Sequence, residues 1–208
     1  MRLLHVILLL PLFGFLASPA ASQEHKTSQK DSSQLQEALK KAPKNRAQLE
    51  RALDNVPLHQ KAGMVFLIEN MPQRDLQELT AEFLAENVAL AYEARDAAPW
   101  GSLLPQDVFL NAVLPYAQVN ERRDNWRADF SKRFQPLVKD CKTPGEAAHV
   151  LNQSIFGAVK VKYSTKRKKP DQSPYESMEI GMASCTGLSI LLADACRACG
   201  VPARLAGT

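Results

Sequence analysis

A cysteine stands where the sequence predicts the start of a helix. The segment SCTGLSILLADACRACG, residues 184–200, has Cys185 directly after Ser184, and serine is a preferred N-cap residue. The first turn of a helix carries unpaired N–H groups and the positive end of the helix dipole, and both stabilise a thiolate. The same N–H groups can face the oxyanion that develops on an attacked carbonyl. The position therefore indicates a nucleophile. The alternative is a buried structural cysteine, because Cys185 lies close to the apolar face of the helix.

That apolar face and the glycine that follows it define the predicted helix. Gly200 is placed to end it as the C′ residue, and Gly-Val-Pro-Ala-Arg then forms a rigid exit. Five apolar residues recur at helical spacing on one face: Leu188, Leu191, Leu192, Ala195 and Cys199.

The other three cysteines, Cys141, Cys196 and Cys199, do not indicate a metal site or a dense disulfide framework. Cys196 and Cys199 form a CxxC motif, but at the C-terminal end of the predicted helix, where the dipole does not favour a thiolate. No two further ligands lie at zinc-binding spacing. We therefore expect Cys196 and Cys199 to be small core residues, and we expect no metal and no cofactor.

Two ordered motifs resemble the nucleophile segment of the transglutaminase-like superfamily, which are papain-like thiol enzymes. They are GMASCTG (181–187) and RACGVPAR (197–204), within about 28 residues that are closely similar. The resemblance implies a helix that carries the nucleophile and packs on an antiparallel sheet bearing His and Asp. It implies that Cys185 forms a thioester, and that Arg197, Pro202 and Arg204 are scaffold positions.

In that superfamily His and Asp follow the cysteine, yet no histidine occurs here after His149. We therefore expect the sequence to be the N-terminal piece of a longer α+β protein, with His and Asp beyond Thr208; the alternative is a naturally short, inactive relative. His149 is a possible base, but an ordinary helix histidine is the more common case. His59 and His25 have a weaker claim.

The remaining pattern predicts a mainly α chain, with a helical region at 34–140 and a truncated transglutaminase-like domain at 141–208. Residues 75–98 form the clearest amphipathic helix, and Pro105 opens another. The next helix is marked by Trp126, Phe130, Phe134 and Leu137. Thr143-Pro144-Gly145-Glu146 is a capping box that starts a helix, residues 159–163 alternate as a short strand, and 165–182 is predicted to be a loop. The basic run at 166–169 is either a solvated loop or a patch for an anionic polymer.

The N-terminus has the three parts of a secretory signal peptide, residues 1–22. Basic Arg2 precedes an apolar run, and small residues follow, with cleavage expected near Ala20 or Ser22. An uncleaved anchor is the alternative. Residues 23–33 are polar and expected to be disordered. The sequence therefore predicts a secreted or periplasmic protein without stable membrane insertion after cleavage.

Two hypotheses of function follow. The first is an exported cysteine enzyme that performs acyl transfer or hydrolysis at peptide or glutamine amide bonds, with a peptide or protein as substrate. The second is a non-catalytic papain-like binding or scaffold protein. The formal net charge of +4 is too small to indicate nucleic acid.

Overall fold

The computed structural model describes residues 33–206 of the chain, and this part is mainly helical, as expected. The signal peptide predicted at 1–22 and most of the polar segment at 23–33 lie outside the described residues. In chain order the elements are helical residues 33–40, α2 (Arg46–Asn55), η1 (Leu58–Gln60), α3 (Lys61–Asn70), α4 (Gln73–Glu78), α5 (Ala81–Ala97), η2 (Gly101–Leu103), α6 (Gln106–Ala112), α7 (Arg127–Val138), α8 (Pro144–Ala158), β1 (Lys162–Tyr163), α9 (Pro174–Ile180), β2 (Met182–Ala183) and α10 (Cys185–Ala198).

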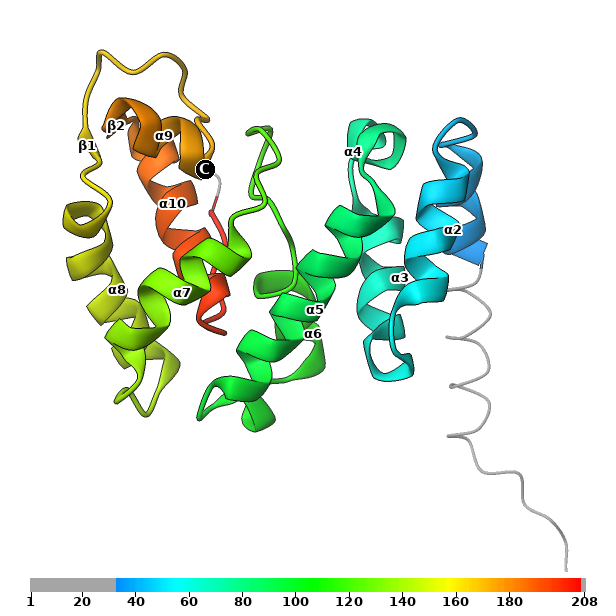
Figure 1. Cartoon of the computed structure of the whole chain (residues 1–208), viewed down its shortest axis with the longest axis horizontal. Helices are drawn as coiled ribbons and strands as arrows, with labels where there is room; N and C mark the ends of the chain where they lie inside the picture. The colour runs from blue at the N-terminus through cyan, green and yellow to red at the C-terminus, as the bar shows by residue number, and fades with distance from the viewer. Residues whose placement is uncertain (1–32, 207–208) are drawn as a thin grey trace, which may run out of the picture.

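Helix α5 lies at the centre of the molecule, with the N-terminal helices on one side and the C-terminal elements on the other (Figure 1). It packs against α2 and α3 on its first side and against α7 and α10 on its second. The structure has two hydrophobic clusters, and α5 contributes to the first of them. The first is built from residues 38–116 and the second from residues 100–201.

The second cluster holds α10 in place. Phe130 and Phe134 of α7 and Leu151 and Ile155 of α8 are buried against it. Trp100, which precedes η2, joins this cluster and donates its indole N–H to the Gly200 carbonyl at 2.8 Å. The cluster therefore draws on both sides of the boundary expected at residue 140, and that boundary stays a prediction.

The helix predicted at 75–98 is wrong as a single element. The chain is extended at Leu79 and Thr80, and α5 begins anew with the Thr80 hydroxyl accepting from the Phe83 N–H at 3.2 Å. The amide of Asn45 donates to the carbonyls of Leu76 and Leu79, at 3.0 and 2.8 Å. These bonds satisfy carbonyls that a continuous helix would pair internally, so a distant side chain stabilises the break.

The stretch predicted as a loop at 165–182 is also wrong in part, because it contains α9 and β2. Helix α9 begins with the capping box Ser173-Pro174-Tyr175-Glu176, the same pattern that correctly predicted α8 at Thr143. The predicted strand is shorter than expected: β1 pairs in parallel with β2 over two residues each.

Within residues 33–206, no helix is both long enough and apolar enough to cross a membrane. All four cysteines are free thiols.

Candidate active site

Local sequence signals determine where α10 begins. Gly181 has φ +68°, a left-handed conformation in which a side chain is strained, and it turns the chain from α9 into β2. Ser184 then caps α10: its hydroxyl accepts from the Gly187 N–H at 3.0 Å and donates to the Pro170 carbonyl. The predicted cap at Ser184 is thus confirmed.

Cys185 is the first residue of α10, and its side chain is exposed. The structure therefore does not place it in the core, which was the alternative left open by the sequence. The N–H groups of Cys185 and Thr186 make no hydrogen bond to any group within residues 33–206. Free N–H groups in a first helical turn are suited to stabilising negative charge on a thiolate or an oxyanion.

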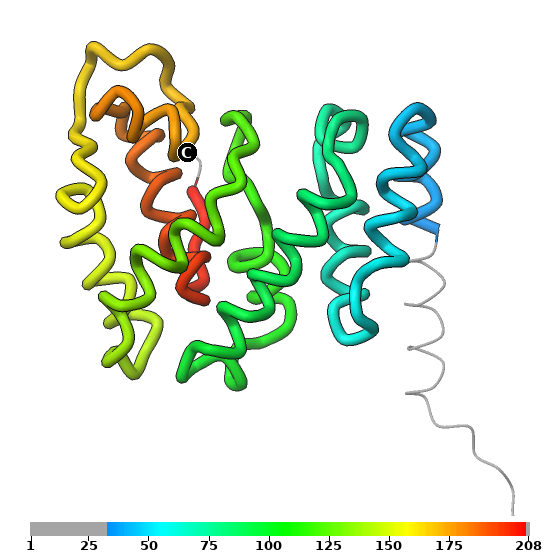
Figure 2. Tube along the Cα trace, in the orientation of Figure 1, coloured from blue at the N-terminus to red at the C-terminus, as the bar shows by residue number. Residues whose placement is uncertain are grey.

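A groove of about 490 Å³ runs from Cys185 along one face of α10. Beyond Cys185 it follows Ser189, Leu192 and Cys196, with Ala148 of α8 on its wall. Residues 202–206 form the other wall. These residues run beside the loop that follows α6, as the chain trace in Figure 2 shows, and the Ala203 N–H donates to the Ala112 carbonyl at 2.9 Å. Cys185 thus opens onto a partly apolar surface large enough for several substrate atoms.

The CxxC cysteines behave as the sequence predicted. Cys196 and Cys199 are buried in the second core, and burial raises the pKa of each thiol to about 12. Both therefore remain protonated at neutral pH and are poor nucleophiles. Cys141 is half-buried. Among residues 33–206, no group of three or more His, Cys, Asp or Glu side chains is arranged to hold a metal ion.

The histidines weighed as a base do not line this groove. His149 is exposed on α8, next to Ala148, which does line it. His59 lies in η1, where its ring meets Tyr92 edge-on with centroids 6.0 Å apart. His25 lies outside the described residues.

Two buried arginines join α10 to the helical region. Arg197, a scaffold position in the resemblance, donates to the carbonyls of Pro115 and Ala117, both at 2.9 Å, and to Ala203 at 2.9 Å. Arg127 at the start of α7 donates to the carbonyls of Val113, Leu114 and Pro115 and to the Asn87 side chain, at 2.6, 2.8, 3.1 and 2.6 Å. Together they hold the 113–117 chain against α10.

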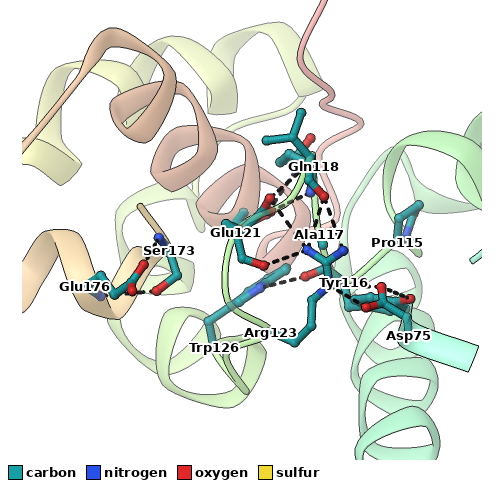
Figure 3. A network of polar contacts seen from close by, with 12 residues as sticks. Asp75, Pro115, Tyr116, Ala117, Gln118, Glu121, Arg123, Trp126, Ser173 and Glu176 are labelled. Carbon is teal, nitrogen blue, oxygen red and sulfur yellow. Dashed lines mark hydrogen bonds and ion pairs between the residues drawn. The ribbon is translucent and has the colours of Figure 1, made fainter. Parts of the chain in front are cut away.

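Further side chains stiffen the loop between α6 and α7 (Figure 3). Arg123 donates to both carboxylate oxygens of Asp75, and the Tyr116 hydroxyl donates to the same carboxylate at 2.8 Å. Glu121 accepts from the N–H groups of Gln118 and Val119 at 2.6 and 2.8 Å. The loop is therefore attached to α4 through Asp75, and hydrogen bonds within the loop also stabilise it.

Gln118 carries this rigidity to α10. Its Nε2 donates to the Oδ1 of Asp194 at 2.9 Å, and its Oε1 accepts from the Leu205 N–H at 3.4 Å. Asp194 is fully buried, and its Oδ2 has no hydrogen-bond partner within residues 33–206. Burial raises the pKa of Asp194 to about 7, against the opposing effects of Arg197 and of the Gln118 hydrogen bond. The Gln118 side chain thus connects α10, the loop between α6 and α7, and the wall of the groove.

The raised pKa of Asp194 predicts how stability depends on pH. The folded chain holds this proton more tightly than the unfolded chain, in which the carboxyl group has its ordinary pKa of 3.8. The resulting stabilisation is complete below about pH 4 and is lost as the pH rises to about 7. An asparagine at this position has no carboxyl proton to lose as the pH rises. We therefore expect Asp194→Asn to have a higher free energy of unfolding than wild type at pH 8, and a smaller increase over wild type at pH 5.

Urea denaturation of both proteins at pH 5 and pH 8 measures this difference, with exposed Asp140→Asn as the control. The groups facing Asp194 are Arg197 on α10, Arg127 on α7, and Gln118 and Glu121 on the loop. The prediction is contradicted if the free energies of unfolding of wild type and Asp194→Asn differ by the same amount at both pH values.

Sequence reasoning did not find Arg127, Gln118 or Asp194. Arg127 and Gln118 lie outside any motif. Arg127 bonds mostly to backbone carbonyls, and Gln118 bonds to the Asp194 carboxylate and the Leu205 N–H far along the chain. Asp194 carried a signal, since it is an acid among the apolar residues LLADAC of the predicted helix. A charged residue in such a run is almost never fully buried unless it is paired.

Comparison with protein families gives one result. Residues 131–208 match the model of the transglutaminase-like superfamily, a stretch that covers most of α7, α8, the two strands, α9 and α10. The match confirms the resemblance seen at 181–204. No curated protein and no solved structure shows significant similarity to the chain.

Proposed function

We propose, from the match of residues 131–208 to the transglutaminase-like superfamily, that Cys185 is the nucleophile of an acyl-transfer enzyme. The Cys185 thiolate attacks the carbonyl carbon of a peptide bond or a glutamine side chain. The C–N bond breaks, the amine or ammonia leaves with a proton, and a thioester remains on Sγ. Water or a second amine then attacks the thioester, releases the product and restores the thiol.

The observation that carries this proposal is the position of Cys185. It is exposed, it is the first residue of a 14-residue helix, and it stands at the end of a groove. The N–H groups of its own turn have no partner within residues 33–206, so they can bind the oxyanion of the tetrahedral intermediate. No other cysteine combines exposure with a helix N-terminus.

The site is held by residues of α10 and of the loop between α6 and α7. Arg197 and Gln118 fix the wall of the groove at residues 203–205, and Ser184 fixes the first turn of α10. The leader predicted at residues 1–22 would place the activity outside the cytoplasm, in the periplasm or the medium. Hydrolysis is the expected outcome, because water is always present and an amine acceptor needs a site of its own.

The test is to incubate the full-length protein with casein, alone and with dansylcadaverine. Ammonia released without amine indicates glutamine hydrolysis, new N-termini indicate peptide cleavage, and fluorescent casein indicates transamidation. We expect at least one product, dependent on Cys185. If no product forms, the chain is instead the papain-like binding or scaffold protein. If Cys185→Ala forms the same products, Cys185 is not the nucleophile.

A further inference from the structure

A strongly basic surface lies on the segment that precedes the nucleophile helix. Residues 160–169, here called the basic segment, read KVKYSTKRKK and contain six cations, while no Asp or Glu occurs between residues 147 and 170. Of these six cations, only Lys169 forms an ion pair within residues 33–206, with Glu176 at 3.0 Å. Lys160, Lys162, Lys166 and Lys168 are exposed. The segment therefore presents a concentrated positive charge to solvent.

The same segment has an open strand edge. Strand β1 lies at the outer side of the molecule, beyond β2 (Figure 1). Lys162 and Ser164 donate their N–H groups to the carbonyls of Gly181 and Ala183, at 3.2 and 2.9 Å. In a parallel ladder the N–H and carbonyl of the intervening residue, Tyr163, point to the other side. No group within residues 33–206 bonds to the backbone N–H or carbonyl of Tyr163 on that side, so a further extended chain can pair at this edge.

The basic segment is tied directly to the first turn of α10. The Pro170 carbonyl, one residue after the segment, accepts from the Ser184 hydroxyl that caps the helix. Gln172 donates its Nε2 to the carbonyl of Met182 at 3.2 Å, three residues before Cys185. A chain bound along the outer edge of β1 is thus one strand away from β2, which leads into Cys185.

Beside the segment lies a polar hollow of about 350 Å³. Its lining residues are Arg122, Lys168, Lys169, Gln172, Glu176 and Glu179. Glu176 is already bound to Lys169 and to the Ser173 N–H of its capping box. Arg122 is already paired with Asp124, and the carboxylate of Glu179 also lines the hollow. Of the three lining cations, Lys168 alone forms no ion pair within residues 33–206, so it is the one that can bind an acidic side chain.

We propose that the basic segment binds an acidic, extended stretch of polypeptide belonging to the substrate on which Cys185 acts. Charge selects the partner, and the open amide edge at Tyr163 requires a peptide backbone, which an anionic lipid surface does not supply. The inference rests on the proposed function only in naming Cys185 as the group that acts on the bound chain.

Binding is measured without turnover, in the full-length Cys185→Ser protein, by anisotropy of a fluorescein-labelled peptide of alternating Glu and Thr. The charge variant is Lys162→Gln/Lys166→Gln/Lys168→Gln, and its control is Lys132→Gln/Lys139→Gln/Lys142→Gln, three exposed lysines on and after α7. We expect the charge variant to bind about 10-fold more weakly, because exposed ion pairs contribute little singly and add across a cluster. The control should bind within about 2-fold of the parent.

A second variant tests the backbone edge. Tyr163→Pro removes the outward N–H, and proline is tolerated on edge strands. We expect weaker peptide binding with an unchanged melting temperature, whereas binding to phosphatidylglycerol vesicles would not depend on this N–H.

The proposal is overturned if the charge variant and the control bind equally, if the matched Gln-Thr peptide binds as well as the Glu-Thr peptide, or if vesicles bind and the peptide does not. These outcomes are independent of catalysis. A protein that binds the acidic peptide but shows no Cys185-dependent product retains this inference and loses the proposed function.

Discussion

Cys185→Ser is expected to lower turnover by about 10³-fold or more, because a hydroxyl is a far weaker nucleophile than a thiolate in the same place. The change is nearly isosteric and the side chain is exposed, so we expect the free energy of unfolding to stay within about 0.5 kcal/mol of wild type. The measurement pairs steady-state rates with urea denaturation of the same preparations.

The matched control is Cys141→Ser, which alters a half-buried thiol of the same protein away from the groove. It should retain wild-type turnover. If Cys185→Ser keeps more than a tenth of the activity, or if Cys141→Ser loses as much, Cys185 is not the nucleophile.

Arg127→Met is expected to destabilise the protein by about 2–5 kcal/mol, since it leaves the buried Val113 carbonyl and the Asn87 Oδ1 without their donor. Arg127 is 2% exposed and donates to the Val113 carbonyl, whereas the carbonyls of Leu114 and Pro115 also accept from Asn87 and Arg197. A methionine fills most of the volume, so the loss comes from hydrogen bonds rather than from a cavity.

Arg133→Met on the same helix is the control. Arg133 is partly exposed and pairs only with Asp129, four residues earlier, at 2.7 Å. We expect that change to cost less than about 0.5 kcal/mol. Equal effects of the two substitutions on the urea midpoint would show that Arg127 does not join α7 to the 113–117 chain.

The parts of the site that the sequence predicted are those with local signals. Ser184 caps α10, and Gly200, with φ +70°, follows its last turn where a side chain would approach the Ala94 carbonyl to 2.4 Å. The start and end of α10, and the burial of Cys196 and Cys199, follow from residues that are neighbours in the chain. The exposure of Cys185 could not be predicted from the sequence pattern. A residue in the first turn can lie close to the apolar face of its helix and still have no neighbouring element packed over it.

Other features depend on residues far apart in the sequence. The periodicity of 75–98 continues across Thr80, and the break there depends on Asn45, more than thirty residues earlier. The hydrogen bonds of Arg127 and Arg197 reach mostly backbone carbonyls, which every residue carries and no motif marks. Gln118 bonds to the Asp194 carboxylate and the Leu205 N–H, which lie more than seventy residues later in the chain. Helix α9 was predictable, since Ser173-Pro174-Tyr175-Glu176 repeats the capping pattern of α8.

The most direct test of the account is the rate at which iodoacetamide alkylates each thiol at pH 7, followed by mass spectrometry of the folded and the urea-unfolded chain. We expect folding to accelerate the alkylation of Cys185, which should be at least about 10-fold faster than Cys141, because only Cys185 meets free N–H groups at a helix N-terminus. Folding should protect Cys196 and Cys199, whose thiols are buried. An account in which Cys185 is the nucleophile is contradicted if folding slows its alkylation, or if Cys196 or Cys199 reacts first in the folded protein.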